Sequence, residues 1–514
     1  MTLAQWLALS VALVFAAASF RIDPLRPLAR ACSVGLVALA LSLGSMVASR
    51  VAPGAGSLDA LVSLGLLSSV MLALVAALGY AVLRYARRYL DRAPDLDRFT
   101  RNLLRVLACA SIVAISNNLV FTVAAWSGAS FFLHALLTFD RRRAQAALVA
   151  HKKFVVSRAA DLCFVAALAL FATSHETLRI DAINAASATT TTVDAFTHAA
   201  MVFVVLGVLL KSAQLPAHGW LTHVMEAPTP ISALLHAGIV NIGGFVLLRL
   251  APTLDRAPVA RAVLLVVALA STVVASLVMV SRPTIKAALA WSTIAQVGFM
   301  LVQCACGAWS LAALHLVAHS LYKAFAFSSA NGVVAKHRST SAAKPARAQQ
   351  SALAPIASAL ALLVAITLVA TGARHATLVA SGLVLAASIF ATRDRWASLQ
   401  SAKLAIVASF AAVFAGLFAV AHVVSARLVT ELAPTAEAPL AAAPALVVLV
   451  VFALEQSARE RPRSTVAAFV RQLVRRALEV DERVTRWLTR RSPLQKNQRI
   501  TPAPQRASKE LESW

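Results

Sequence analysis

Charged residues are scarce in this chain, and acidic residues are the scarcest of them. Only 14% of the 514 residues are Asp, Glu, Lys or Arg, and 22 of these are acidic against 48 basic. Soluble domains carry roughly a quarter charged residues, so the composition excludes an ordinary soluble protein. The 59% of hydrophobic residues predict a polytopic membrane protein.

Cysteine is also rare, and its spacing excludes two kinds of site. The chain has neither a CxxC pair nor a Cys/His cluster at zinc spacing among Cys32, Cys109, Cys163, Cys304 and Cys306. We therefore expect no bound metal, no cofactor and no disulfide framework. The net charge of +26 lies mostly in short segments between apolar runs, which indicates contact with anionic membrane lipids and not with nucleic acid.

The apolar runs are long enough to be counted as membrane spans, at about 20 residues for each helix. The first run, "LAQWLALSVALVFAAASF", lacks a basic leader and a cleavage site, so it is expected to be retained. The pattern predicts an all-α protein with about fifteen spans, near 3–20, 31–49, 58–83, 103–117, 119–139, 154–173, 196–214, 230–250, 262–281, 285–304, 309–335, 353–371, 375–391, 403–426 and 439–455. The split between 117 and 119 rests on "SNNL", a turn signal inside a stretch too long for one helix.

The charges of the loops predict the orientation. Loops 84–102 and 140–153 are rich in Arg and Lys, whereas "HETLRIDAINAASATTTTVDAF" and "TELAPTAEAP" are acidic. The positive-inside rule then places the N-terminus in the periplasm and the C-terminus in the cytoplasm of a bacterial inner membrane, with loop 251–261 as the main exception. Residues 1–455 form the predicted membrane domain, and 456–514 form a basic tail that begins with an amphipathic helix. That helix either lies on the cytoplasmic headgroups or offers a docking surface for a partner.

A lysine ends one of the apolar runs, where a charge is expensive. Lys211 closes "HAAMVFVVLGVLL", and Pro216 follows five residues later. A snorkelling lysine that reaches the headgroups is one interpretation. The other is a functional charge beside a broken helix, because irregular backbone at membrane depth is tolerated only next to protein or water.

Three titratable residues lie on one face of a later span. In "HLVAHSLYK", His315, His319 and Lys323 are spaced i, i+4 and i+8, a pattern that core packing does not explain and that indicates a proton or ion path. His236, in "ISALLHAGIVNIGGF", is either a hydrogen-bonded structural residue or a proton carrier, since imidazole titrates near neutral pH.

Four further residues are candidates for tuning the charge of the site. Arg158 and Asp161 are three apart and can pair on one helix face. Lys286 begins another span, and Glu226 lies in the loop "VMEAPTP", where ordering of the loop is the simpler role.

Three long stretches carry a family resemblance. "LLKSAQLPAHGWLTHVMEAPTPISALLHA", "IKAALAWSTIAQVGFML" and "ALHLVAHSLYKAFAFSSA" resemble the antiporter-like membrane subunits of respiratory NADH:quinone oxidoreductase and of multisubunit cation/proton antiporters, over about residues 100–335. The resemblance implies inverted helical repeats with a broken helix near Pro216. It also implies a chain of buried protonatable groups, namely Lys211, His236, His315, His319 and Lys323.

The chain departs from that family at several points. Ser127 stands where the family has a glutamate that pairs with the lysine matching Lys211, and Thr284 replaces the usual acidic residue before Lys286. The later lysine of the second broken helix and the long lateral helix of the respiratory subunit are also not evident.

With these departures, the sequence resembles a narrower group, the membrane subunits of bacterial inorganic carbon transporters. That resemblance implies a large zinc-containing partner subunit that converts CO2 to bicarbonate, while this chain, not itself an enzyme, conducts protons or Na+ to drive it. Two alternatives stay open. One is a proton-pumping subunit of a respiratory complex or antiporter, and the other is a non-conducting membrane anchor for a soluble enzyme.

Overall fold

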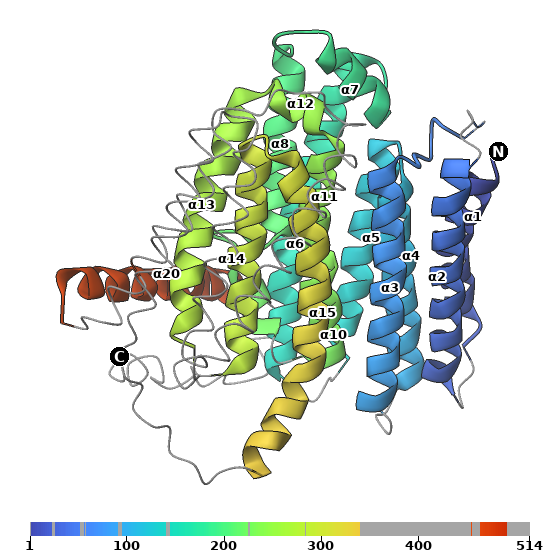
Figure 1. Ribbon diagram of the computed structural model, residues 1–514. Helices are drawn as coiled ribbons and strands as arrows, with labels where there is room; N and C mark the ends of the chain where they lie inside the picture. Colours follow the sequence, from blue (N-terminus) through green and yellow to red (C-terminus); the bar gives the residue numbers. More distant parts are fainter. Residues whose placement is uncertain are drawn as a thin grey trace, which may run out of the picture.

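The chain folds into a bundle of membrane-length helices (Figure 1). The computed structural model describes residues 2–339, except 23–25, 52–55, 57, 91–94, 140–143, 225–226 and 283, and then residues 454 and 463–490. In these residues, eight helices are long and apolar enough to cross a membrane. This confirms the predicted all-α, polytopic membrane fold.

The helices follow one another with short connections. The N-terminal part contains α1 (Leu3–Phe20), α2 (Pro27–Val51), α3 (Leu66–Tyr89), α4 (Leu96–Ile115), α5 (Leu119–Leu137), α6 (Ala144–His175) and α7 (Ile180–Ala188). The central part contains α8 (Ala195–Lys211), α9 (Gly219–His223), α10 (Thr229–Ala237), the 3₁₀ turn η2 (Ile239–Asn241), α11 (Ile242–Arg249) and α12 (Ala251–Asp255). The last described helices are α13 (Pro258–Val280), α14 (Ile285–Ala305), α15 (Trp309–Ser339) and α20 (Thr465–Arg490).

The first eleven predicted spans all correspond to helices, with three notable shifts. α6 begins at Ala144 instead of residue 154. α3 begins at Leu66 instead of residue 58, because residues 58–61 turn and Val62 forms a β-bridge with Ser116. α4 begins at Leu96 instead of 103, because its polar first turns extend the helix beyond its apolar part. The four spans predicted after residue 352 lie outside the described residues, so the total of fifteen stays a prediction.

The predicted break at "SNNL" is confirmed. α4 ends at Ile115 and α5 begins at Leu119. The Asn118 side chain accepts a hydrogen bond from the Val120 N–H at 2.8 Å, so it satisfies one of the free donors at the start of α5. A single polar residue therefore starts a new span inside a long apolar stretch.

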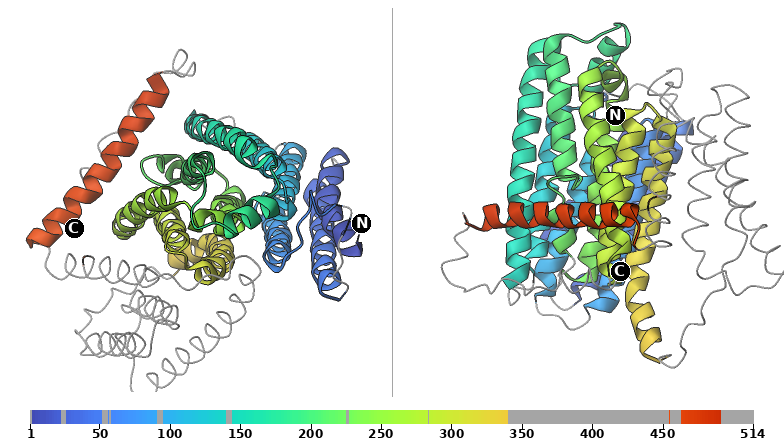
Figure 2. Two further views of the ribbon diagram at one scale, coloured as in Figure 1. Left: turned by 90° about the horizontal axis from the view of Figure 1, so that it is seen from above. Right: turned by 90° about the vertical axis from the view of Figure 1, so that its left-hand side faces the viewer.

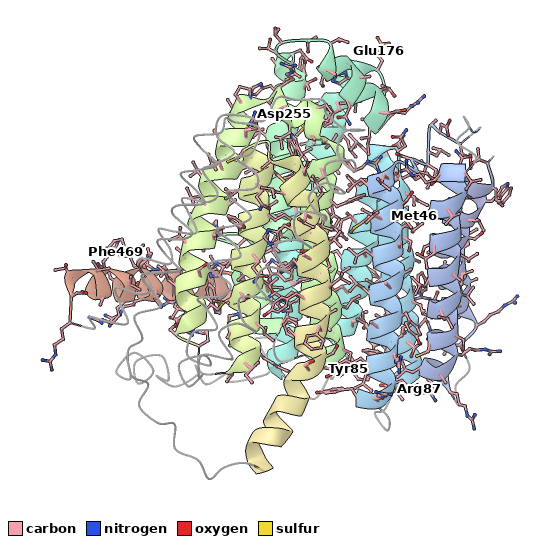
Figure 3. All side chains as sticks on the ribbon, in the orientation of Figure 1. Met46, Tyr85, Arg87, Glu176, Asp255 and Phe469 are labelled. Atoms are coloured by element: carbon pink, nitrogen blue, oxygen red, sulfur yellow. The ribbon has the colours of Figure 1, made fainter. Side chains whose placement is uncertain are left out.

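Successive connections alternate between the two ends of the bundle. Glu176 and Asp255 lie at one end, and Tyr85 and Arg87 lie at the other (Figure 3). This alternation agrees with the predicted order of loops. Which end faces the periplasm stays a prediction.

Helix α20 crosses the side of the bundle instead of running parallel to it (Figure 2). It contacts α13 and α6 and buries Ala467, Val470 and Val474. These residues are spaced i, i+3 and i+7, so they form one apolar stripe of an amphipathic helix. The two views place α20 at the edge of the bundle opposite α1 and α2.

The start of α8 is held by an aspartate. Asp194 Oδ1 accepts hydrogen bonds from the backbone N–H groups of Phe196 and Thr197 at 2.9 and 3.0 Å, and Oδ2 accepts from the hydroxyls of Ser174 and Thr197, both at 2.6 Å. Partial burial raises the pKa of Asp194, but these hydrogen bonds outweigh it and lower the pKa from 3.8 to about 2.

We expect Asp194→Ala to lower the free energy of unfolding by about 1 kcal/mol at neutral pH, because it removes a helix cap. The folded-state pKa is below the ordinary value, so this stabilisation is complete above about pH 4 and is lost as the pH falls toward about 2. Thermal unfolding in detergent at neutral pH and at about pH 3 measures both effects. Asp194→Asn, which keeps a capping oxygen, is the control, and an equal deficit in the two variants would contradict the capping role.

Candidate functional site

The helix that carries Lys211 is broken at membrane depth. α8 ends at Lys211, and α9 does not begin until Gly219, which confirms the predicted break near Pro216. The intervening segment is hydrogen-bonded to its neighbours: the Leu215 N–H donates to Ser271 Oγ at 2.9 Å, and the Ser212 hydroxyl donates to the Val240 carbonyl at 3.2 Å. The irregular segment is therefore stabilised by neighbouring helices, as membrane interiors require.

Lys211 points into the protein and not toward the headgroups. Its ammonium lies 2.7 Å from Asp161 Oδ1 of α6, and 4% of its side chain is exposed. Asp161 Oδ2 also lies 2.7 Å from a guanidinium nitrogen of Arg158. The snorkelling interpretation is therefore wrong, and Asp161 serves both Lys211 and Arg158.

Two aromatic rings and one glycine set the position of Lys211. Its ammonium lies 4.8 Å from the centre of the Trp126 ring and 5.5 Å from that of Phe164, within the range of a cation–π interaction. A Cβ atom at Gly207, one turn before Lys211, would lie 2.6 Å from the Phe164 ring. Gly207 thus allows α8 to approach α6 closely enough for the ion pair to form.

Ser127 occupies the family's glutamate position but still takes part in the site. Its hydroxyl donates to Asp161 Oδ1 at 2.6 Å, the same oxygen that contacts Lys211. The carboxylate that pairs with Lys211 is therefore on α6, and the α5 residue Ser127 orients it.

A second buried lysine was missed in the sequence. Lys153 of α6 is 3% exposed, and its ammonium donates to the carbonyl oxygen and the hydroxyl of Ser130 at 2.6 and 2.5 Å. Its place beside the basic "RRRAQAALVAHKK" suggested a cytoplasmic loop, but α6 begins at Ala144. The i, i+8 spacing of Lys153 and Asp161 along one helix was the available signal.

The second cluster joins α10, α14 and α15. Lys323, fully buried, donates to Ser292 Oγ at 2.8 Å and to the Leu289 carbonyl at 3.1 Å. His236 Nδ1 lies 3.1 Å from Thr293 Oγ1, and the His236 ring stacks on Phe327, one turn after Lys323. Adjacent residues of α14 therefore bind the lysine and the histidine.

His315 and His319 continue this face of α15, as predicted. Their rings are 6.1 Å apart, and His315 Nδ1 lies 3.1 Å from Gln303 Oε1 of α14. Both nitrogens of the buried His319 lack a hydrogen-bond partner among the described residues, as does His236 Nε2. Buried polar atoms of this kind are typically stabilised by bound water or mark a functional group.

The broken segment after Lys211 reaches toward the second cluster. The His218 ring lies 5.1 Å from the ring of Trp291, the neighbour of Ser292. Gln214 packs close to Gly298 of α14, where a Cβ atom would lie 2.8 Å from Gln214 Oε1. Polar side chains of residues 212–218 thus lie between α8 and α14, which carry the partners of the two lysines.

Two predicted tuning residues are not brought into either cluster. Lys286 is half-buried in the first turn of α14, six residues before Ser292. Glu226 lies outside the described residues. Their roles stay predictions, whereas the predicted Arg158–Asp161 pair is present.

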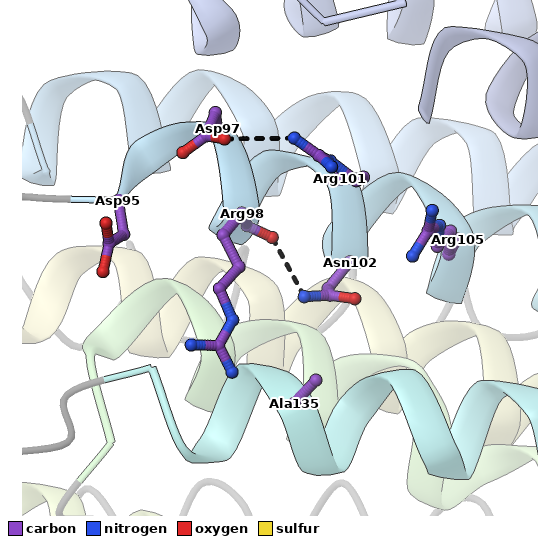
Figure 4. Close-up of a pocket in the computed structure, with 7 residues that line it drawn as sticks. All are labelled: Asp95, Asp97, Arg98, Arg101, Asn102, Arg105 and Ala135. Carbon is purple, nitrogen blue, oxygen red and sulfur yellow. Dashed lines mark hydrogen bonds and ion pairs between the residues drawn. The ribbon is translucent and has the colours of Figure 1, made fainter. Parts of the chain in front are cut away.

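A polar cavity of about 580 Å³ lies away from both clusters, at the beginning of α4. Asp95, Asp97, Arg98, Arg101, Asn102 and Arg105 line it from α4 and the residue before it, and Ala135 lines it from α5 (Figure 4). Arg101 is engaged by Asp97 at 3.0 Å. In the part of the chain that the structure describes, no group of three or more His, Cys, Asp or Glu could hold a metal ion.

Comparisons of sequence agree with this architecture. A family model described as NADH:quinone oxidoreductase/Mrp antiporter, transmembrane, matches residues 116–406. The chain is 44% identical over 272 residues to a probable inorganic carbon transporter subunit DabB of Hydrogenovibrio crunogenus, covering 52% of each protein. It is 40% identical over 289 residues to the subunit DabB2 of Halothiobacillus neapolitanus, covering 54% of the chain and 52% of the relative. It is 30% identical over 275 residues to NADH-quinone oxidoreductase subunit L of Mycobacterium tuberculosis, covering 52% of the chain and 42% of the relative.

Each match thus spans about half the length of the relative or less. Among solved structures, the Mrp complex from Dietzia sp. superposes with a TM-score of 0.56 at 24% identity, covering 95% of this chain and 57% of that one. The archaeal membrane-bound sulfane sulfur reductase superposes with a TM-score of 0.57 at 14% identity, covering 95% of this chain and 98% of that one. These two likenesses bear on the fold alone.

We expect Asp161→Asn to destabilise the protein by about 3 kcal/mol, because it leaves the buried Lys211 ammonium without a counter-charge. The double variant Asp161→Asn/Lys211→Met removes both charges and should recover most of that loss. Thermal unfolding of the two single variants and the double variant in detergent gives the coupling energy. Strictly additive effects would contradict a direct ion pair.

Proposed function

We propose that this chain, which belongs to the family of NADH:quinone oxidoreductase and Mrp antiporter transmembrane subunits, is the gradient-coupling membrane subunit of an inorganic carbon pump. Protons, or Na+, move inward past Lys211, His236 and Lys323. Their movement drives CO2 hydration and bicarbonate accumulation by a large zinc-containing DabA-like partner. Catalysis belongs to that partner, and this chain supplies ion conduction.

The observation that carries the proposal is the pair of buried lysines with different partners. Lys211 pairs with a carboxylate, whereas Lys323 donates hydrogen bonds to neutral oxygens. Ionisable residues inside a membrane are costly and usually mark ion pathways. The polar side chains between the two lysines support a route from one to the other.

The membrane potential supplies the driving force for such a route. One elementary charge that crosses the membrane gains about 2.3 kcal/mol per 100 mV, which is sufficient to make a coupled hydration step hard to reverse. Lys211, Asp161 and Arg158 form a compact charged group. A proton added to this group or removed from it changes the local field without any need for a metal in this chain.

The similarity to relatives named as inorganic carbon transporter subunits favours this function over a respiratory pump. Ser127, at the position where the family resemblance implies a glutamate, supports the same choice, because it departs from the respiratory pattern. A non-conducting anchor is disfavoured by the cost of the buried lysines, since an anchor needs no titratable group at depth.

We expect Lys211→Ala and Lys323→Ala each to reduce energy-dependent bicarbonate uptake at least tenfold in cells that produce the full complex. Insertion and assembly should be preserved, because each alanine removes a costly buried charge. Uptake of labelled bicarbonate, with and without an uncoupler, measures the effect. Arg179→Ala, in an exposed ion pair with Asp181, is the matched control. Uptake that persists in both lysine variants, or after the gradient is collapsed, would instead indicate the anchor.

Affinity purification of the chain in mild detergent tests the partner. We expect one large, soluble, zinc-containing protein to remain bound, identified by mass and by metal analysis. If a set of redox and other membrane subunits were bound instead, the result would contradict this proposal and assign the chain to a respiratory or antiporter complex.

A further inference from the structure

Helices α5 and α6 share a line of polar contacts that leads to Lys211. On α5 the residues are Ser127, Ser130 and His134, spaced i, i+3 and i+7, so they lie on one helix face. On α6 their partners are Asp161, Lys153 and Ala150, in the reverse order along the chain. We call these six residues the α5–α6 seam.

The contacts of the seam are direct at every level. His134 Nδ1 lies 3.0 Å from the Ala150 carbonyl oxygen. One turn further into the bundle, Lys153 donates to the carbonyl and hydroxyl of Ser130. Another turn on, Ser127 donates to Asp161, which contacts Lys211. Polar groups therefore follow one another along α5 without an intervening apolar turn.

The outer end of the seam lies at the aqueous end of α5. His134 is half-buried in the last turn of α5, and the next residue, Ala135, lines the polar cavity of about 580 Å³. The same cavity is lined by the charged residues Asp95, Arg98 and Arg101. Charged side chains are stable at low cost only where they contact water or lipid headgroups. The outer end of the seam thus lies next to a residue that lines a polar cavity, and its inner end is a buried ion pair.

Lys153 is the costliest member of the seam. It is 3% exposed, and its ammonium donates hydrogen bonds to the neutral oxygens of Ser130. Asp161 lies eight residues further along α6, roughly 12 Å at the rise of an α-helix. A packing role would be met at lower cost by methionine, which has a similar shape and no charge. A buried lysine is therefore better explained by the proton that it can exchange.

We propose that the α5–α6 seam is the path by which protons travel between the aqueous end of α5 and Lys211, with Lys153 as the transfer residue midway. This inference rests on the proposed function and adds the coupling ion. The titratable side chains of the seam before Asp161 are basic. Such groups carry protons but repel Na+.

Each step moves one proton and restores the donor. The imidazolium of His134 passes a proton through a bridging water to the neutral Lys153 amine, and bulk water then protonates His134 again. The resulting ammonium passes one proton to the Asp161 carboxylate by way of the Ser130 hydroxyl, a second bridging water and the Ser127 hydroxyl, each of which accepts one proton and donates another. Asp161 then protonates the neutral Lys211 amine and is again a carboxylate. Lys153, neutral once more, accepts the next proton from His134.

Substitution of Lys153 by arginine distinguishes a role in proton transfer from a structural role. Lys153→Arg keeps a positive charge and hydrogen-bond donors, but guanidinium does not release its proton at physiological pH. Lys153→His keeps a group that exchanges protons. We expect at least tenfold lower proton flux for Lys153→Arg and Lys153→Met, and measurable recovery for Lys153→His. The measurement is dye-monitored acidification of vesicles that contain the full complex, under an imposed proton gradient.

Two control variants make the outcome specific. Lys152→Met changes a lysine that is equally buried but projects about 100° around α6, and it should retain flux. Lys211→Ala should abolish flux if the proposed function holds. If Lys153→Arg or Lys153→Met kept full flux while Lys211→Ala had none, the proton path through the seam would be wrong, but the proposed function would stand. Full flux in Lys211→Ala would contradict both the proton path and the proposed function.

Accessibility provides a test that does not depend on flux. In a chain whose five cysteines are replaced by serine, Ser130→Cys should react with a small, charged thiol reagent, because the seam admits water. Ala129→Cys, on the same helix at a site with no exposed surface, should not react. Equal protection of both positions would contradict a hydrated path.

Discussion

The structure depends on the ion pair between Lys211 and Asp161. A lone ammonium in a low-dielectric interior costs several kcal/mol, so every neighbouring feature has to bring a compensating group to it. Gly207 lets α8 approach α6, Ser127 orients the carboxylate, and Trp126 and Phe164 cover the ammonium. The break in the helix directly after Lys211 then places polar side chains beside the pair.

The two lysine clusters are stabilised in different ways. A carboxylate holds Lys211, whereas the hydroxyl and carbonyl groups of α14 hold Lys323. Asp161 is shared with Arg158, whose side chain is 39% exposed, so one acidic group pairs with two basic ones and the group keeps one excess positive charge. A change of protonation at either lysine alters the charge of a tightly packed region. This sensitivity is what the proposed gradient coupling requires.

The fold could be predicted from sequence to a large extent, and the site only in part. Asn118 starts α5 as a turn signal should, and His315 and His319 share a helix face as their spacing requires. Lys153 was assigned to a loop because hydropathy does not recognise the polar first turns of a long helix. The start of α3 was placed too early because the β-bridge between Val62 and Ser116 is a tertiary pairing that has no local signal.

Sequence alone determined that this is a multi-span helical membrane protein with a broken helix near Pro216, because hydropathy, helical period and proline act locally. It also identified most of the buried titratable residues, but not Lys153, since a charge in an apolar run is conspicuous wherever the chain folds. Only the tertiary structure decided which charges meet. Asp161 and Lys211 are far apart in the chain, and Ser130 reaches Lys153 across a helix hairpin. Such partners depend on the rotation and separation of packed helices, which no local pattern encodes.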